Sequence, residues 1–274
     1  MVGKTLRPLE ELSNAIEKTD ENNLFLKVHE PNSNDEVAKL SVSFNNMVSK
    51  LEKAFVAQKN FSANAAHELK TPLTAMIACV ECCLLDEFPT PLEYRETLED
   101  VLQNAERLST LVSDLLKMNM DEAMILREKI DVKKMFEEII AELSDDVGGN
   151  IRIDNHVGNI TLHGDKGLLN RAFSNLIHNA VKYNRPGGTV EILAAQIDDT
   201  IVISILDTGI GISSDQIDKI FSPFYCVDKS RSRELGGSGL GLSIVKSIVD
   251  KHGGIVRVQS TLGTSTTVTV TLPK

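Results

Sequence analysis

The sequence predicts a multidomain chain that is α-helical at first and α/β from about residue 128 onward. Apolar residues recur at alternating three- and four-residue spacing through residues 6–19, 37–65 and 98–115, the spacing of one helix face. Beyond them, short β-like runs alternate with helical stretches, which favours helices layered on one face of a mixed sheet. At 274 residues the chain is long enough for two or three such modules.

Composition narrows the class of protein. The net charge of −10 argues against nucleic acid or an anionic membrane as the main partner. Aromatic residues make up 4% and Trp is absent, which suits helical bundles better than an aromatic stacking surface. No apolar run approaches the roughly 20 residues that span a bilayer, so we expect a soluble, cytoplasmic piece.

The first helix is expected over 6–19, with Pro8 near its start, and an extended connector over 20–34. Asp35-Glu36 then opens a second helix, whose apolar positions continue without a break through Ala65 toward His67. This repeat favours a coiled coil or parallel bundle, and a core-facing helix remains an alternative.

The stretch Phe61–Leu73 places a histidine, a carboxylate and a hydroxyl on this second helix. His67 and Thr71 share one helix face because they are four residues apart. Pro72 lacks an N–H, so we expect the helix to bend there. Taken alone, an ordinary solvated helix turn explains the stretch equally well.

The segment after the His67 stretch predicts two long antiparallel helices joined by a turn. The second helix is expected to end near Leu85, and the prolines of 86–91 predict a turn. The returning helix carries an apolar stripe over 98–115, and two such hairpins bury their stripes by forming a dimeric four-helix bundle. The cysteines Cys79 and Cys82 have CxxC spacing, but core packing is favoured over metal binding because no second pair completes a site.

The C-terminal part alternates between strands and helices. Strands are expected at Ile151–Asp154, Val190–Ala195, Ile201–Leu206, Ile255–Gln259 and Thr266–Leu272, and helices at 132–147, 165–183 and 238–252.

Three constellations in this part have the chemistry of a nucleotide site. Asn175 and Asn179 lie one helical turn apart, and amide oxygens suit Mg²⁺ that keeps its waters and nucleotide phosphates. Asp207 leaves a strand into glycines, where a carboxylate can accept from an exocyclic amine. Glycines 236–241 run into a helix N-terminus, which favours phosphate. Each motif alone is weak evidence for a nucleotide site, and two Asn residues on one helix face are more often ordinary solvent-exposed side chains.

In this order, behind a histidine-bearing bundle, the motifs are far more specific. The opening resembles the HAMP signal-relay module, and the chain as a whole resembles a sensor histidine kinase. The resemblance covers the H box at 61–73, the N box at 171–183, the G1 box at 207–211, the F box at 221–225 and the G2 box at 236–241.

The resemblance implies a role for each matching residue. His67 is the expected phospho-acceptor, Glu68 its base or orienting partner, and Thr71 the residue that orients water in a phosphatase reaction. Asn179 is the expected Mg²⁺ ligand, Asp207 the adenine contact, and Lys182 a phosphate contact. The other expected nucleotide-binding residues are Asn175, Tyr183, Gly209, Gly211, Lys229, Arg231, Arg233, Gly237, Gly239, Leu240 and Gly241.

The resemblance also implies an organisation and partners. It divides the chain into a HAMP module at 1–52, a dimerisation and histidine-phosphotransfer hairpin at 53–127, and a catalytic ATP-binding domain of the GHKL type at 128–274. The expected activity is ATP- and Mg²⁺-dependent autophosphorylation, phosphotransfer to an Asp of a response regulator receiver domain, and phosphatase activity. The expected state is a homodimer, as the cytoplasmic portion of a bacterial membrane receptor whose transmembrane segment is not in this chain.

Some residues depart from the family pattern. Cys226 stands where Arg is frequent, Ser265 where a glycine is usual, and Val268 where an aromatic is common. Two other readings stay open: an ATPase of the same nucleotide fold without histidine chemistry, and a degenerate kinase that serves as a dimeric scaffold. The turn at 86–91 sets whether His67 is phosphorylated in cis or in trans, and both remain open.

Overall fold

The computed structural model describes residues 27–29, 36–85, 90–118, 126–143, 151–228 and 238–274. The chain divides into two compact units, Met1–His67 and Glu68–Lys274. The predicted helix at 6–19 and most of the predicted connector lie outside the described residues. Within the described ranges, no helix combines the length and apolarity needed to cross a membrane.

In the first unit, part of the connector is bound to the helix that follows it. The Asn45 side chain donates to the Val28 carbonyl and accepts from the Val28 N–H, both at 3.0 Å. Phe44 and Val48 are buried next to Val28. A side-chain amide thus satisfies the backbone of an extended segment as a neighbouring strand would.

One continuous helix, α2 (Glu36–Leu85), links this region to the His67 stretch and beyond. It begins at Glu36, as the Asp-Glu pair predicted, and runs through Pro72 to Leu85. The predicted unbroken repeat is therefore confirmed as one helix of 50 residues. The bend at Pro72 stays a prediction.

The returning helix is α3 (Pro91–Met118), and its start corrects the prediction for Pro91. We expected Pro91 in the turn, but it is the first helical residue. Thr90 caps the helix: its N–H and Oγ1 donate to Glu93 Oε2 at 2.6 and 2.8 Å, and the Glu93 N–H donates back to Oγ1 at 3.3 Å. Proline fits the first helical position because the N–H it lacks would be unpaired there.

Each hairpin helix has a half-buried stripe and a second, exposed apolar stripe. On α2, Leu69, Met76, Cys79 and Cys83 are half-buried, whereas Cys82 is exposed. The exposed stripe has its own helical spacing: Leu73, Ile77, Val80 and Leu84 are three or four residues apart on α2, and α3 carries two pairs four residues apart, Leu98 with Leu102 and Val112 with Leu116. Four free cysteines are present in the chain, and the described residues hold no cluster of three metal-ligating side chains.

The C-terminal part is an α/β sandwich, as predicted. Its five-stranded sheet has the order β2-β4-β5-β7-β6; β2 and β4 are parallel, and the other neighbours are antiparallel. The strands are β2 (Arg152–Asn155), β4 (Thr189–Ile197), β5 (Thr200–Asp207), β6 (Ile255–Thr261) and β7 (Ser265–Pro273). The helices are α4 (Val132–Leu143), α5 (Lys166–Lys182) and α7 (Gly241–Lys251).

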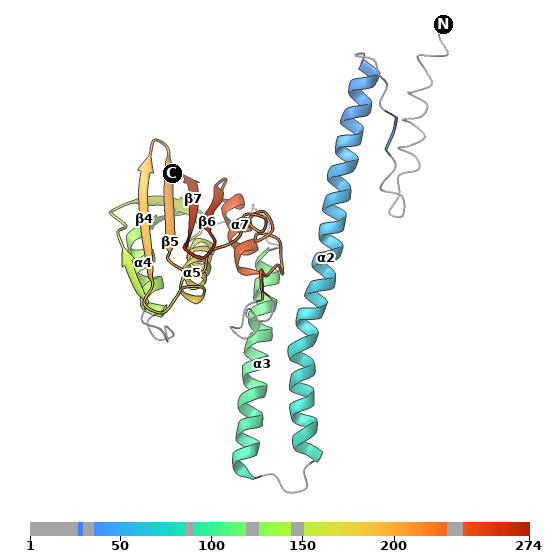
Figure 1. Ribbon diagram of the computed structural model, residues 1–274, viewed down its shortest axis with the longest axis vertical. Helices are drawn as coiled ribbons and strands as arrows, with labels where there is room; N and C mark the ends of the chain where they lie inside the picture. Colours follow the sequence, from blue (N-terminus) through green and yellow to red (C-terminus); the bar gives the residue numbers. More distant parts are fainter. Residues whose placement is uncertain (1–26, 30–35, 86–89, 119–125, 144–150, 229–237) are drawn as a thin grey trace. The chain divides into compact units, whose positions relative to one another are not determined.

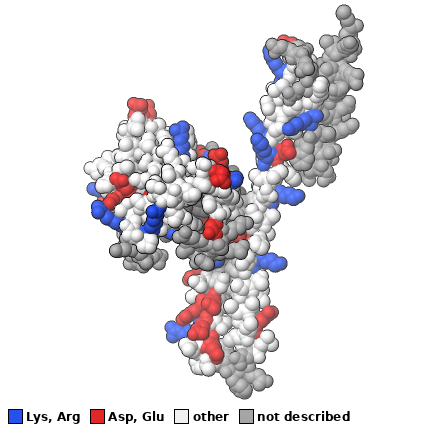
Figure 2. Space-filling view, viewed as in Figure 1, with Lys and Arg blue, Asp and Glu red and all other residues white. Residues whose placement is uncertain are grey.

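The helices cover one face of the sheet (Figure 1). Ile201, Ile203 and Ile205 of β5 are buried against them, while the residues that alternate with these are half-buried. On the visible face of the α/β part, acidic and basic side chains are interspersed, whereas acidic side chains gather along α3 (Figure 2).

A two-stranded antiparallel sheet was not predicted. It consists of β1 (Glu128–Asp131) and β3 (Thr161–Gly164). Each strand has only four residues. Ile130 and Leu162 lie opposite each other and are buried, which attaches this small sheet to the main core.

Candidate functional site

Asp207 is the last residue of β5 and is only 8% exposed. Its Oδ1 accepts from the Gly209 N–H at 2.9 Å. Burial raises the pKa of Asp207, while hydrogen bonds from the backbone of Gly209 and Thr266 oppose the rise. The carboxyl is thus fixed by one turn of backbone at the end of a central strand, with acceptor capacity left for a ligand amine.

The turn after Asp207 packs directly on the residues that end α5. A Cβ on Gly209 would overlap the Tyr183 carbonyl oxygen, so only glycine fits there. The same carbonyl accepts from the Ile210 N–H at 3.1 Å, and Arg185 Nη2 donates to the Gly209 carbonyl at 3.2 Å. The predicted N and G1 boxes therefore meet through their backbones.

Asn184 and Arg185 were missed by the sequence analysis. Asn184 is 7% exposed; its Nδ2 donates to the Thr189 carbonyl at 3.0 Å, and its Oδ1 accepts from Thr208 Oγ1 at 3.2 Å. It joins the end of α5, the start of β4 and the turn after β5. The only sequence signal was a short polar residue before the Arg-Pro-Gly-Gly turn, which is common in loops.

The other side of the turn is closed by the β6–β7 hairpin. Gly211 has φ of 67°, and a Cβ there would overlap the Thr261 carbonyl. Ser260 Oγ accepts from the Ile212 N–H at 2.8 Å and donates to the Ser265 carbonyl at 2.9 Å. Ser265 departs from the family pattern, but it takes part in this contact only through its backbone carbonyl. Ser260 and Thr266 were also missed as site residues.

The two asparagines meet the glycine turn at the start of α7. A Cβ on Gly241 would lie 3.8 Å from Asn175 Oδ1 and from Asn179 Nδ2. Asn175 Nδ2 is buried and has no hydrogen-bond partner within the described part of the chain. The first N–H groups of α7 have no partner inside the helix, which suits an anion. Amide groups beside a helix start fit a nucleotide with its Mg²⁺.

Lys182 stands at the end of this asparagine face. Burial lowers the pKa of Lys182; the neighbouring Cys226 opposes that change, and Arg107 of α3 adds to it. Its Nζ lies 5.5 Å from the centroid of the Tyr183 ring. Cys226, which stands where the family frequently has Arg, is thus an electrostatic neighbour of Lys182, the predicted phosphate contact.

The F box packs against the G2 turn. The Phe224 N–H donates to the Gly239 carbonyl at 3.0 Å, and both residues have positive φ, 62° and 73°. A Cβ on Gly239 would lie 2.9 Å from Phe224 Cα and 3.0 Å from Cys226 Sγ. Leu240 next to it is fully buried. The remaining predicted residues of this segment, Lys229, Arg231, Arg233 and Gly237, lie outside the described residues.

The residues of the H box all lie on α2. His67 and Thr71 are exposed, and Glu68 is half-buried. The boundary between the two compact units falls between His67 and Glu68. Glu68 and Thr71 therefore belong to the same unit as Asp207, Asn175 and Asn179, and His67 belongs to the first unit.

Three protein families match consecutive parts of the chain. Residues 1–53 match the HAMP domain, and 57–123 match the His Kinase A (phospho-acceptor) domain. Residues 164–274 match the histidine kinase-, DNA gyrase B- and HSP90-like ATPases.

The curated relatives that match the chain are named as sensor histidine kinases. The sensor histidine kinase RppB of Synechocystis is 37% identical over 227 residues, which is 80% of this chain and 50% of RppB. The sensor histidine kinase CusS of Escherichia coli is 33% identical over 280 aligned residues, 99% of this chain and 57% of CusS. The chain therefore spans about half the length of these relatives.

Among solved structures, the histidine kinase AdeS of Acinetobacter baumannii has a TM-score of 0.62 at 23% identity, covering 76% of this chain and 97% of AdeS. At these identities the likeness concerns the fold, a helical region followed by an α/β ATP-binding domain. Together with the family matches and the curated relatives, it places the chain among the sensor histidine kinases of two-component systems.

Proposed function

We propose that this chain binds ATP with Mg²⁺ in the site around Asp207 and transfers the γ-phosphoryl group to His67. The observation that supports the proposal best is the convergence of Asp207, the two asparagines and the start of α7 in one unit. Three glycines line the approaches, where side chains would overlap neighbouring backbone. Asn175 Nδ2 is buried and has no hydrogen-bond partner among the described residues, which fits a polar ligand.

In this proposal Asp207 accepts from the adenine amine, and Asn179 and Asn175 face the Mg²⁺–phosphate end with Lys182. Tyr183, Gly209, Gly211, Gly239 and Gly241 shape the pocket. Lys229, Arg231, Arg233 and Gly237, which lie outside the described residues, complete the proposed set of nucleotide-binding residues. Bound Mg²⁺ supplies neutralisation of phosphate charge, which is most of what phosphoryl transfer requires.

The transfer forms one bond and breaks one. The lone pair of His67 Nε2 forms an N–P bond with the γ-phosphorus as the bond to the bridging oxygen breaks, and ADP leaves with that electron pair. Glu68 accepts from Nδ1–H of the ring and stabilises the positive charge that develops on it.

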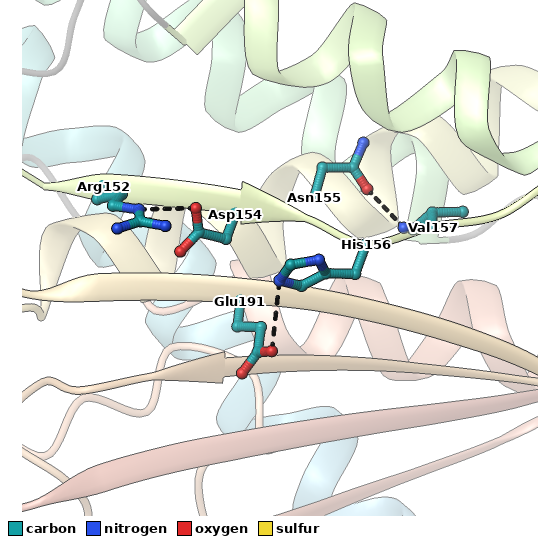
Figure 3. Close-up of polar contacts among 6 residues, drawn as sticks. All are labelled: Arg152, Asp154, Asn155, His156, Val157 and Glu191. Atoms are coloured by element: carbon teal, nitrogen blue, oxygen red, sulfur yellow. Dashed lines mark hydrogen bonds and ion pairs between the residues drawn. The ribbon is translucent and has the colours of Figure 1, made fainter.

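The test is incubation of the full chain with γ-labelled ATP and Mg²⁺. We expect acid-labile, base-stable label that is lost in His67→Ala and in Asn179→Ala. His156→Gln is the matched control, because His156 lies on the surface after β2, with Nε2 3.5 Å from Glu191 Oε1 (Figure 3). Label that survives His67→Ala contradicts the acceptor assignment. Nucleotide hydrolysis without label favours the ATPase reading, and absence of both favours the scaffold.

We also propose a phosphatase activity toward the phosphorylated partner, which depends on Thr71. Thr71 is exposed on α2 and lies one turn after His67. Its hydroxyl can orient water toward an aspartyl phosphate. Thr71→Ala is expected to lower dephosphorylation at least about a hundredfold, the lower end of what one positioned donor supplies, and to leave autophosphorylation intact. An equal loss of both activities contradicts this role.

The partners and setting follow from the same assignment. We propose a homodimer that passes the phosphoryl group to an Asp of a response regulator receiver domain. We further propose the bounds 1–52, 53–127 and 128–274 for the HAMP, phosphotransfer and ATP-binding modules. The chain would act on the cytoplasmic side of a bacterial membrane receptor, joined to the membrane through an upstream segment. Phosphotransfer profiling against purified receiver domains identifies the partner.

A further inference from the structure

The turn after β5 is held in place by the residues that follow α5. The Ile210 N–H donates to the Tyr183 carbonyl at 3.1 Å, and Arg185 Nη2 donates to the Gly209 carbonyl at 3.2 Å. The donating N–H and the accepting carbonyl belong to the same peptide, the one between Gly209 and Ile210. Its orientation is therefore fixed at both ends by residues outside the G1 box.

The Asn184 side chain holds the preceding residue of the turn. Asn184 Oδ1 accepts from Thr208 Oγ1 at 3.2 Å and from the Arg185 N–H at 2.9 Å. Asn184 Nδ2 donates to the Thr189 carbonyl at 3.0 Å, and the Thr189 N–H donates to Thr208 Oγ1 at 2.8 Å. One amide side chain thus ties together the start of β4, the turn after β5 and the backbone of the arginine.

The space around this amide is closed. A Cβ on Gly188 would lie 2.1 Å from Asn184 Oδ1 and 2.8 Å from Thr208 Oγ1. Asn184 is 7% exposed, whereas Arg185 and Thr208 are exposed residues. Because the amide is enclosed and hydrogen-bonded on both its oxygen and its nitrogen, it has little room to move, and the groups bonded to it share its fixed position.

The position of the turn decides where the Asp207 carboxyl points. Asp207 Oδ1 accepts from the Gly209 N–H at 2.9 Å, and the next peptide of the chain is the one that Arg185 holds. A hydrogen bond weakens steeply as its angle departs from linear, so a displaced Gly209 would turn the carboxyl or lose it. The remaining lone pairs of the carboxyl would then change direction as well.

We propose that Asn184 and Arg185 are positioning residues for base recognition: by holding the turn after β5, they aim the Asp207 carboxyl at the exocyclic amine of adenine. This rests on the proposed ATP site and deepens it, because it assigns residues to the base selectivity of that site. Loss of either side chain is expected to weaken the contact with the amine and to spare the contacts with the phosphates, which the proposed function places at α5 and the start of α7.

The first test compares ATP with the analogue in which hydrogen replaces the 6-amino group, by calorimetric titration of the full chain. The unaltered chain is expected to bind ATP roughly tenfold more tightly than the analogue, as a hydrogen bond to a charged group supplies. Arg185→Ala is expected to lose most of this ratio through weaker ATP binding, with unchanged affinity for the analogue. Arg152→Ala is the matched control, because the exposed Arg152 side chain pairs with Asp154 at 2.8 Å (Figure 3).

Each other result of this titration contradicts the proposal. An unchanged ratio in Arg185→Ala overturns the positioning role, and so does an equal loss of affinity for both ligands, which is the mark of a general structural change. If the unaltered chain binds ATP and the analogue equally, there is no amine contact to position, although the rest of the ATP site stands. If it binds neither ligand, the ATP site itself is wrong.

The second test addresses Asn184, directly and through its exposed partner Thr208. Thr208→Val removes the hydroxyl that donates to Asn184 Oδ1 and is expected to lower the ratio of the two affinities, whereas Thr208→Ser keeps the hydroxyl and the ratio. Asn184→Ala is expected to lower the ratio too, with urea unfolding measured on the same sample. Equal ratios in Thr208→Val and Thr208→Ser contradict the proposal, as does a folded Asn184→Ala chain with the ratio of the unaltered chain.

Discussion

At the scale of single residues, Asp207 shows how the sheet prepares a ligand contact. Its carboxyl is buried and held by the Gly209 N–H. We predict that Asp207→Asn retains the fold, because an amide oxygen can accept the same hydrogen bond, but loses about 1–3 kcal/mol of ATP binding. Calorimetric titration with ATP measures the loss, and GTP is the control ligand. Unchanged ATP affinity contradicts the adenine contact.

The direction of the Asp207 pKa shift determines how the contribution of this residue to folding stability changes with pH. The folded-state pKa of this carboxyl is raised, chiefly by burial, above its ordinary value of 3.8. The folded state therefore holds this proton more tightly than the unfolded chain, and the contribution is present below the unfolded pKa and lost as pH rises through the folded value. Relative to the unaltered chain, Asp207→Asn is expected to gain stability between pH 4 and neutrality. Urea unfolding at several pH values checks the sign.

His252 joins two parts of the core through both ring nitrogens. It is 4% exposed; Nδ1 lies 2.7 Å from the Ile248 carbonyl, and Nε2 accepts from the Asp165 N–H at 3.1 Å. We predict that His252→Ala lowers the free energy of unfolding by about 1–3 kcal/mol, because a buried N–H loses its acceptor. Exposed His163 provides the control: His163→Ala should stay within about 0.5 kcal/mol of the unaltered chain in the same urea titration.

Residues whose chemistry a motif displays could be predicted from the sequence, whereas residues that act through the fold could not. Asp207 and the glycines stand next to each other in sequence, so their pattern was readable. Asn184 and Ser260 work by bonding to segments that are distant in sequence, such as Thr208 and Ile212. Only the sheet order brings those segments together, and no local pattern encodes it.

At the scale of elements, α3 depends on its cap. Thr90 donates twice to Glu93, and these bonds, first from the backbone and then from the side chain, lower the pKa of Glu93. We predict that Thr90→Ala destabilises the first turn of α3 by about 0.5–2 kcal/mol. Faster amide exchange at Tyr94 and its neighbours, with the α7 amides unchanged, is the expected result. Unchanged exchange throughout α3 contradicts the cap.

The long elements were predicted because their apolar residues recur at a regular spacing over many positions. Helix α2 and strands β4, β5 and β7 have this property, and each was found within a few residues of its expected place. The four-residue strands β1 and β3 are too short for a period to be visible. Pairing with each other and burial of Ile130 and Leu162 define them instead.

At the scale of the whole molecule, the exposed apolar stripe of the α2–α3 hairpin predicts an interface with a second copy of the chain. Leu73 is 48% exposed and Leu98 is 67% exposed on the single chain. We predict that Leu73→Asp converts the proposed dimer to a monomer, because a charge would be buried between two copies. Ala78→Asp, also exposed on α2 but on another side, should remain dimeric. Sedimentation velocity distinguishes the two, and a dimeric Leu73→Asp chain contradicts the interface.

The parallel pairing of β2 with β4 has a consequence for the order in which the domain folds. Parallel neighbours cannot be joined by a tight turn, and the crossover here contains α5, with Asn175 and Asn179. Closing so long a loop is slow unless the helix inside it has already formed and shortened it. We therefore expect helix-weakening changes at exposed positions of α5, such as His178→Gly, to slow refolding more than they speed unfolding in stopped-flow measurements. The helix that carries the proposed nucleotide-binding asparagines would then belong to the folding nucleus.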